Sequence, residues 1–160
     1  MKTVNSTRER ILLAALALFA NRGIGKTTLN EVAFRACVTR VTVYRYFANK
    51  EELVRAAYLR VEQVFQDGLA DLQQAPAADW QRVLVAIGER LSALPSGDVS
   101  ARADELKRLY PDVSLAIQAV RVVTLNGIFD HLFNLAKRQG LLRPGLSRPL
   151  VQAIFWELVI

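Results

Sequence analysis

The chain has 160 residues, of which 52% are hydrophobic, and this length provides one domain or two small ones with a sizeable core. A single cysteine, Cys37, excludes an internal disulfide framework and fits a reducing, cytoplasmic location. The charge is uneven: residues 1–60 carry 11 Lys and Arg against 4 Asp and Glu, whereas the remaining residues carry 10 against 11. This segregation predicts a basic part that binds a polyanion and a roughly neutral body.

Three helix-start signals lie in the first third of the chain. Ser6–Glu9, Thr28–Glu31 and Asn49–Glu52 each combine a polar cap with a glutamate three residues later, the pattern of a capping box. Apolar residues at helical spacing follow the first signal, and Gly23 is expected to end that helix. Three helix starts leave little room for a sheet, so we predict a helix at each signal, the last running over residues 49–73.

The segment VTRVTVYRYFANK, residues 38–50, has the composition of a strand because β-branched and aromatic residues dominate it. An isolated strand between two capped helices would leave its backbone groups unpaired. We therefore predict a two-turn helix from Arg40 to Phe47, capped by Thr39, with Val43 and Phe47 pointing inward. Its helix propensity is poor, so tertiary packing is expected to stabilise it, and its basic and aromatic side chains remain outside.

Beyond residue 73 the pattern stays helical, and the expected fold class is all-α with no membrane-spanning helix. The expected elements are helices at residues 80–94 (capped by Asp79), 99–109 and 113–139, a turn at 95–98 and a loop at 140–149. A last helix starts near Ser147 and reaches the C-terminus without a stop signal. This predicts that the sequence is a piece of a longer chain.

A helix, a tight turn and a short second helix with exposed basic residues together form a helix-turn-helix. Its second helix fits the major groove of DNA, where arginine pairs with guanine and the methyl groups of threonine or valine meet that of thymine. Tyrosine hydroxyls and a lysine at a helix N-terminus suit phosphate oxygens. A solvated basic face is the plain alternative for a single charged run, but the turn, both caps and the basic first part together favour DNA binding.

The stretch of residues 11–57 resembles the TetR (tetracycline-repressor-like) family of bacterial transcriptional regulators. The resemblance rests on Phe19, Gly23, Thr27-Thr28, Val32-Ala33, Ala36, Val38-Thr39, Tyr44-x-Tyr46-Phe47 and Lys50-Glu51-x-Leu53. It implies that the first three helices bind operator DNA, with Arg40, Val41 and Thr42 facing base edges. The implied contacts to phosphates or the groove wall are Thr27, Thr28, Thr39, Tyr44, Arg45, Tyr46 and Lys50.

Two positions depart from the family pattern. Cys37 stands at a turn position where the family usually has glycine and where φ is expected to be positive, which costs roughly 1 kcal/mol or more for a residue with a side chain. Val41 stands where Gly or Ala is common. A valine there either displaces the recognition helix or adds a contact to a thymine methyl group.

The resemblance further implies a ligand pocket and a two-fold dimer interface in the later helices, although those residues carry no shared signature. Aromatic residues at helical spacing are more often core than pocket. The pocket candidates are Phe65, Trp80, Phe129, His131 and Phe133. The dimer candidates, an apolar stripe at i, i+3, i+4, i+7 and i+8, are Val151, Ile154, Phe155, Leu158 and Val159.

The sequence thus predicts a DNA-binding domain at residues 1–50 and a regulatory and dimerisation domain at residues 51–160. The expected function is transcriptional regulation, chiefly repression, by a homodimer that binds double-stranded operator DNA and a small-molecule effector. No cofactor, metal or membrane partner is expected. The alternative is an architectural or protein-binding module with the same DNA-binding domain but no small-molecule switch. A solid core in residues 51–160 would favour this alternative, whereas an enclosed pocket would favour regulation. An enzyme is disfavoured because the sequence has no nucleophile–base or metal-ligand set.

Overall fold

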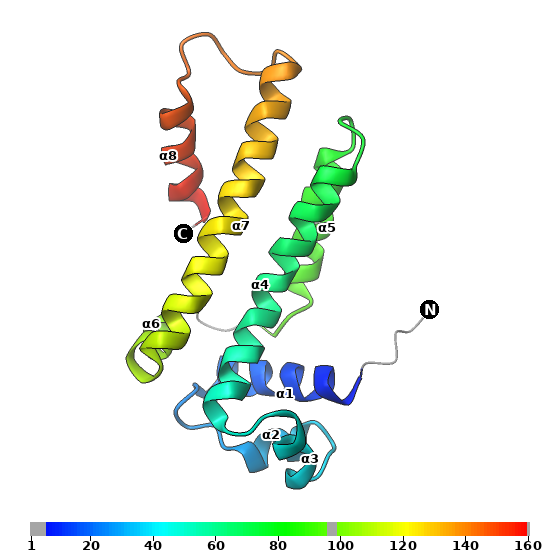
Figure 1. The fold of residues 1–160 in the computed structure, drawn as a ribbon, viewed down its shortest axis with the longest axis vertical. Helices are drawn as coiled ribbons and strands as arrows, with labels where there is room; N and C mark the ends of the chain where they lie inside the picture. Colours follow the sequence, from blue (N-terminus) through cyan, green and yellow to red (C-terminus); the bar gives the residue numbers. More distant parts are fainter. Residues whose placement is uncertain (1–5, 96–98, 160) are drawn as a thin grey trace.

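The computed structural model describes the backbone of residues 6–95 and 99–159, and the regular secondary structure in these ranges is entirely α-helical. The helices are α1 (Thr7–Arg22), α2 (Leu29–Arg35), α3 (Arg40–Tyr46), α4 (Lys50–Gln74), α5 (Trp80–Ser92), α6 (Val99–Leu109), α7 (Pro111–Arg138) and α8 (Arg148–Val159). Figure 1 shows α1–α3 gathered at one end, here called the head, and α4, α5, α7 and α8 extending away from it in the body. The predicted all-α fold is confirmed. The turn expected at residues 95–98 lies, except for Pro95, outside the described residues.

The three predicted capping signals start helices, but only one is a reciprocal capping box. The Thr28 hydroxyl accepts a hydrogen bond from the Glu31 amide, and the Glu31 carboxylate accepts one from the Thr28 amide at 2.8 Å. Ser6 and Asn49 accept from the amides three residues on, at 3.2 and 2.8 Å. Their glutamates have other partners, because Glu9 accepts from the Arg60 side chain and Glu52 from the Ala48 amide. Asp79, expected to cap α5, makes no side-chain capping hydrogen bond.

The helix reading of the β-rich segment is confirmed. The Thr39 hydroxyl caps α3 by accepting from the Thr42 amide at 3.1 Å. Val43 and Phe47 are fully buried in the head, where they supply the packing that the poor helix propensity of α3 requires. The turn before α3 contains Cys37 with φ = 54°, so the positive φ expected there is present in a residue that is not glycine.

Two apolar clusters stabilise the molecule, and the boundary between them does not coincide with the end of the head. The first cluster joins α1–α3 and the start of α4 to Leu106 of α6 and to Val113 and Ile117 of α7. The second lies farther along the body, among α4, α5 and α7, around Leu72 and Leu125. The body therefore contributes side chains to the core beneath the head.

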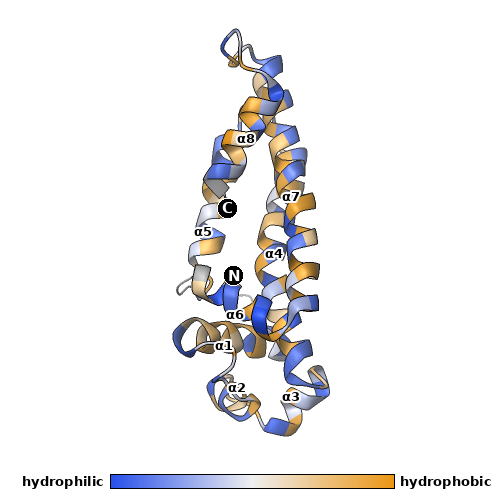
Figure 2. Ribbon diagram, turned by 90° about the vertical axis from the view of Figure 1, so that its left-hand side faces the viewer, coloured by the Kyte–Doolittle hydropathy of each residue, from blue (hydrophilic) through white to orange (hydrophobic). Residues whose placement is uncertain are grey.

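Judged by length and composition alone, helix α7 is long and apolar enough to cross a membrane. The sequence had led us to expect no helix of that kind. Helix α7 packs chiefly against α4 and α6 and contributes to both apolar clusters. In Figure 2 apolar residues run along much of its length beside α4. These contacts are those of a core helix in a helical body.

Candidate DNA-binding surface

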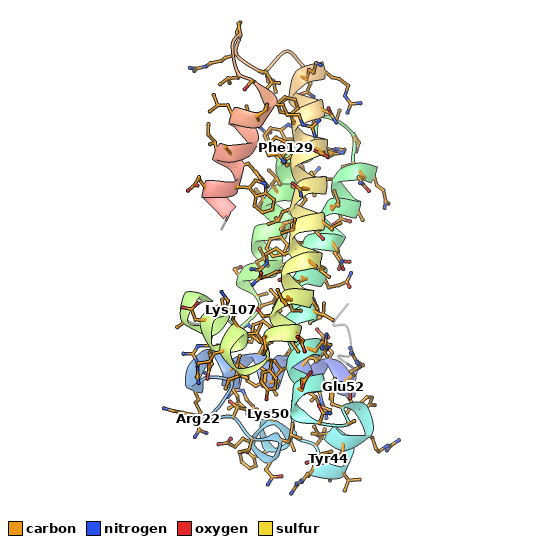
Figure 3. The ribbon with its side chains drawn as sticks, turned by 60° about the vertical axis from the view of Figure 1, so that its left-hand side comes forward. Arg22, Tyr44, Lys50, Glu52, Lys107 and Phe129 are labelled. Carbon is orange, nitrogen blue, oxygen red and sulfur yellow. The ribbon has the colours of Figure 1, made fainter. Side chains whose placement is uncertain are left out.

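The exposed face of α3 carries most of the residues predicted to contact DNA. Val41 has 70% of its surface accessible, a high value for an apolar side chain, and Arg40, Tyr44, Arg45 and Tyr46 are exposed beside it. Buried Val43 on the opposite side anchors the helix to the head. Figure 3 places Tyr44 at the extreme end of the head, away from the body. This arrangement leaves one side of a short, firmly packed helix free to enter a groove.

Arg40 and Tyr44, one helical turn apart, contact each other. The Arg40 guanidinium donates a hydrogen bond from Nη2 to the Tyr44 hydroxyl at 3.2 Å. It also lies over the tyrosine ring, with Cζ 5.3 Å from the ring centroid. The tyrosine thus orients the candidate base-reading arginine before DNA arrives.

The two threonines that precede α2 differ in their environment. Thr27 is only 2% exposed, and its hydroxyl donates to the Gly23 carbonyl at 2.8 Å, so this predicted contact lies inside the loop rather than on the surface. Thr28 is exposed at the N-terminus of α2, and its hydroxyl donates to Glu31 at 2.9 Å. Of the pair, Thr28 is the residue whose side chain is accessible to a phosphate.

Lys50 also has a partner within the protein. It is the first residue of α4, half-buried, and its Nζ donates to the Gly25 carbonyl at 3.1 Å. Burial lowers the pKa of Lys50 below its ordinary value, while the charges of Glu105 and Glu31 act in the opposite direction. Figure 3 places Lys50 where α4 leaves the head. Its ammonium group therefore links α4 to the loop before α2.

Several exposed head residues were missed by the sequence reasoning. Phe34 on α2 is 87% exposed, and the next residue, Arg35, is exposed as well. Lys26 is exposed in the loop before α2, and Arg8 lies over the Phe47 ring with Cζ 5.5 Å from its centroid. Phe34 and Arg35 lie at the end of α2, the first helix of the helix-turn-helix, directly before the turn. A cavity of about 480 Å³ adjoins this part of the head; it is lined by Arg10, Leu13, Ala14, Ala17, Arg35, Ala36, Cys37 and Pro95.

The aromatic residues predicted to line an effector pocket mostly pack in the core. Phe129 is buried, with its ring centroid 5.6 Å from that of Phe133 and 5.4 Å from that of Phe155. Phe65 packs against the second apolar cluster, and His131 is half-buried on α7. Trp80 lines a cavity of about 280 Å³ between α5 and the end of α7. The other lining residues are Leu132, Leu135, Ala136, Gln139 and Leu141.

The predicted dimer stripe on α8 is divided between two environments. Phe155 and Trp156 pack against the second apolar cluster of the same chain. Ile154 and Leu150 are about half exposed, and Val151 is intermediate. The side chains of Leu158 and Val159 lie outside the described part of the structure. Phe155, the central residue of the predicted seam, therefore packs within its own chain.

The buried anchors, the capped turn and the exposed basic and aromatic face of α3 define a helix-turn-helix DNA-binding domain. Residues 11–57 match the family described as bacterial regulatory proteins, tetR family. Residues 11–57 are therefore a DNA-binding domain of the tetR family type.

A curated relative extends the similarity beyond the head. The protein named Probable acrEF/envCD operon repressor, from Escherichia coli K12, is 32% identical over 119 residues, which is 72% of this chain and 54% of the relative. The chain thus spans about half the length of this relative.

Solved structures of regulators share the fold over nearly the whole chain. FadR from Bacillus subtilis, solved with stearoyl-CoA, is 22% identical with a TM-score of 0.63 and covers 92% of this chain and 80% of its own. AibR, solved with isovaleryl coenzyme A and operator DNA, is 24% identical with a TM-score of 0.66 and covers 96% of this chain and 84% of its own. At these identities the likeness concerns the fold.

Proposed function

We propose that the protein is a transcriptional regulator that binds operator DNA with residues 1–50 and is controlled through residues 51–160. The observation that carries the proposal is the free face of α3, where Arg40, Val41 and Tyr44 project from a helix whose other side is buried. Arg40, Val41 and Thr42 contact base edges in this proposal. Thr28, Thr39, Tyr44, Arg45, Tyr46 and Lys50 contact phosphates or the groove wall. The protein acts in the cytoplasm and has no catalytic role.

Repression is the form of regulation that the comparisons favour, and we propose that a homodimer carries it out. A relative matched over 72% of this chain is named a probable operon repressor. One head contacts only a few base pairs, whereas a two-fold dimer doubles the contacts and fixes the half-sites about 34 Å apart. The exposed apolar residues Leu150 and Ile154 on α8 are the candidates for the dimer seam. We propose these two residues in place of Phe155 as the centre of the seam, because Phe155 packs inside its own chain.

The proposed effector has an apolar part that enters the cavity beside Trp80. That cavity is lined by leucine, alanine and tryptophan side chains with Gln139 as a polar member, a composition that suits a hydrocarbon chain. Two proteins of the same fold were solved with acyl-CoA molecules, so an acyl-CoA is the first class to test. An effector that prefers the conformation unable to bind DNA would release the operator.

A second function, DNA binding with no small-molecule switch, is favoured by one observation. Phe129, Phe133 and Phe155 form a packed aromatic cluster in the part of the body where a pocket was predicted. Fluorescence separates the two functions. In a Trp156→Phe variant, Trp80 remains the single tryptophan, and acyl-CoA should change its emission and release the DNA. Unchanged emission and unchanged DNA binding would favour the architectural function.

DNA recognition is tested by selecting binding sites from a randomised library with the wild type and Arg40→Ala. If Arg40 reads a guanine, its loss should cost about 1–3 kcal/mol and relax the preference at one base pair in each half-site. Arg82→Ala is the control, because it removes the same charge from an exposed position on α5. Affinity for DNA should also fall steeply as the salt concentration rises, because each neutralised phosphate releases about 0.9 counterion. Equal, sequence-independent losses in both variants would refute base reading by Arg40.

A further inference from the structure

A carboxylate from the body binds the backbone of the head. Glu105 lies on α6, 80 residues along the chain from the loop that joins α1 to α2. Its Oε2 accepts a hydrogen bond from the Ile24 amide at 2.9 Å, and its Oε1 accepts one from the Gly25 amide at 3.0 Å. Both oxygens of one side chain are thus used on two consecutive amides, and the acceptor is charged, which makes such bonds short and strong.

The loop is shaped to receive this side chain. Gly23 has φ = +89°, and a Cβ added there would lie 2.4 Å from Nη1 of Arg102 and 2.9 Å from Oε2 of Glu105. Nη1 of Arg102 is in turn 2.6 Å from the same Glu105 oxygen. The absence of a side chain at Gly23 therefore lets an ion pair of α6 lie directly against the loop. Ile24, the next residue, is completely buried in the first apolar cluster.

The same loop is held by two further hydrogen bonds, one from α4 and one within the loop itself. Lys50, at the start of α4, donates to the Gly25 carbonyl, and the buried Thr27 hydroxyl donates to the Gly23 carbonyl. Thr28 follows at once and caps α2. The conformation of residues 23–27 consequently sets where α2 begins and, through the packing of α2 on α3, how the recognition helix is presented.

We propose that Glu105 is a positioning residue for DNA binding, whose carboxylate fixes the loop before α2 and so holds the head in one orientation on α6. The proposal rests on the DNA-binding function proposed above and adds a means of regulating it. A head that is already fixed in its binding orientation loses less conformational entropy when it binds DNA. A displacement of α6 would change that orientation. The contact joins the regulatory body directly to the DNA-binding motif.

The test compares Glu105→Gln with Asp104→Asn. Glutamine has one acceptor oxygen and places an NH₂ group toward the second loop amide, so at least one of the two bonds is lost. Asp104 is the neighbouring exposed acid on α6, and its amide variant removes the same charge. Glu105→Gln should bind operator about tenfold more weakly, within the usual range of such couplings, whereas Asp104→Asn should match the wild type.

Amide hydrogen exchange provides a readout that does not depend on DNA. The Ile24 and Gly25 amides should be protected in the wild type and in Asp104→Asn, and should exchange faster in Glu105→Gln, while the α4 amides that follow Leu53 stay unchanged. Arg102→Gln, which keeps the carboxylate but removes its ion pair, should weaken operator binding in the same direction by a smaller factor. This second variant decides the matter if Glu105→Gln is not folded.

The outcomes separate the two proposals. If wild-type protein binds no DNA specifically, the proposed function fails, while the exchange of the two loop amides still reports whether the contact exists. If specific binding is present but Glu105→Gln and Arg102→Gln both bind like Asp104→Asn, Glu105 has no positioning role. Unprotected Ile24 and Gly25 amides in the wild type would overturn the contact itself.

Discussion

Replacing Arg121 by methionine should destabilise the body strongly, because Arg121 is the partner of a buried acid. Glu62 on α4 is 1% exposed. Its carboxylate accepts from Arg121 of α7, from Nε at 3.1 and 3.2 Å and from Nη2 at 2.5 Å. Removing one partner of a buried pair costs about 3–5 kcal/mol because a charge remains in an apolar environment. Since the Arg121 side chain is 41% exposed, water partly screens the pair, and we expect about 3 kcal/mol.

The measurement is the free energy of unfolding from urea titration at neutral pH. Arg138→Met is the matched control, because Arg138 is an exposed arginine on the same helix and its loss should change stability by less than about 0.5 kcal/mol. The double variant Glu62→Met with Arg121→Met removes both charges and should recover most of the loss, since the cost arises from the unpaired carboxylate. A loss in Arg121→Met no larger than in Arg138→Met would refute this reasoning.

Three further predictions concern stability. Gly68→Ala should destabilise the α4–α5 contact by about 1–3 kcal/mol, because its Cβ would lie 2.4 Å from Cδ1 of Ile87, whereas Gly88→Ala, with open space around it, should raise the thermal midpoint and stabilise by up to about 1 kcal/mol. Burial raises the pKa of Glu105, but hydrogen bonds from the two loop amides and the charges of neighbouring arginines outweigh it and hold the net value below the ordinary 4.5. Because the pKa of Glu105 is lower in the folded state than in the unfolded state, its charged form contributes stability above about pH 4.5, and this contribution is lost as the pH falls through the folded-state pKa. Urea titrations below pH 4.5 should therefore show a falling free energy of unfolding, and the fall should be smaller in Glu105→Gln. Cys37→Gly should stabilise the head by about 1 kcal/mol in thermal unfolding, because φ is 54° there; an unchanged midpoint would mean that the turn carries no strain.

The helices of the head were predictable because their signals are local. The Thr28–Glu31 box and the Thr39 cap act over three residues, and the structure contains both. The helix at residues 40–46 was also predictable, although its composition favours a strand, because both flanking segments begin helices and leave no partner strand. Neighbouring residues were sufficient for these conclusions.

The partners of charged side chains were less predictable, since a long side chain reaches several donors. Glu9 and Glu52 were expected to bond to the backbone of their own caps, but Glu9 bonds to Arg60 and Glu52 to the Ala48 amide. A guanidinium group offers Glu9 a charged donor, which is a stronger partner than a neutral amide. Such competition depends on a residue 51 positions away, and the local pattern contains no information about it.

The contacts between the head and the body also depend on residues far apart in the chain, and they are the hardest to predict from the sequence. In the sequence, Glu105 is one acid among others on a predicted helix, and Gly23 indicates only the end of a helix. Together they form a contact only because the first apolar cluster brings α6 against the α1–α2 loop, with Leu106 beside Glu105 buried in it. Apolar packing therefore comes first and determines which polar groups meet. In this protein it places an acid of the body on the loop before α2, and this is the contact through which we propose that the head is positioned for DNA.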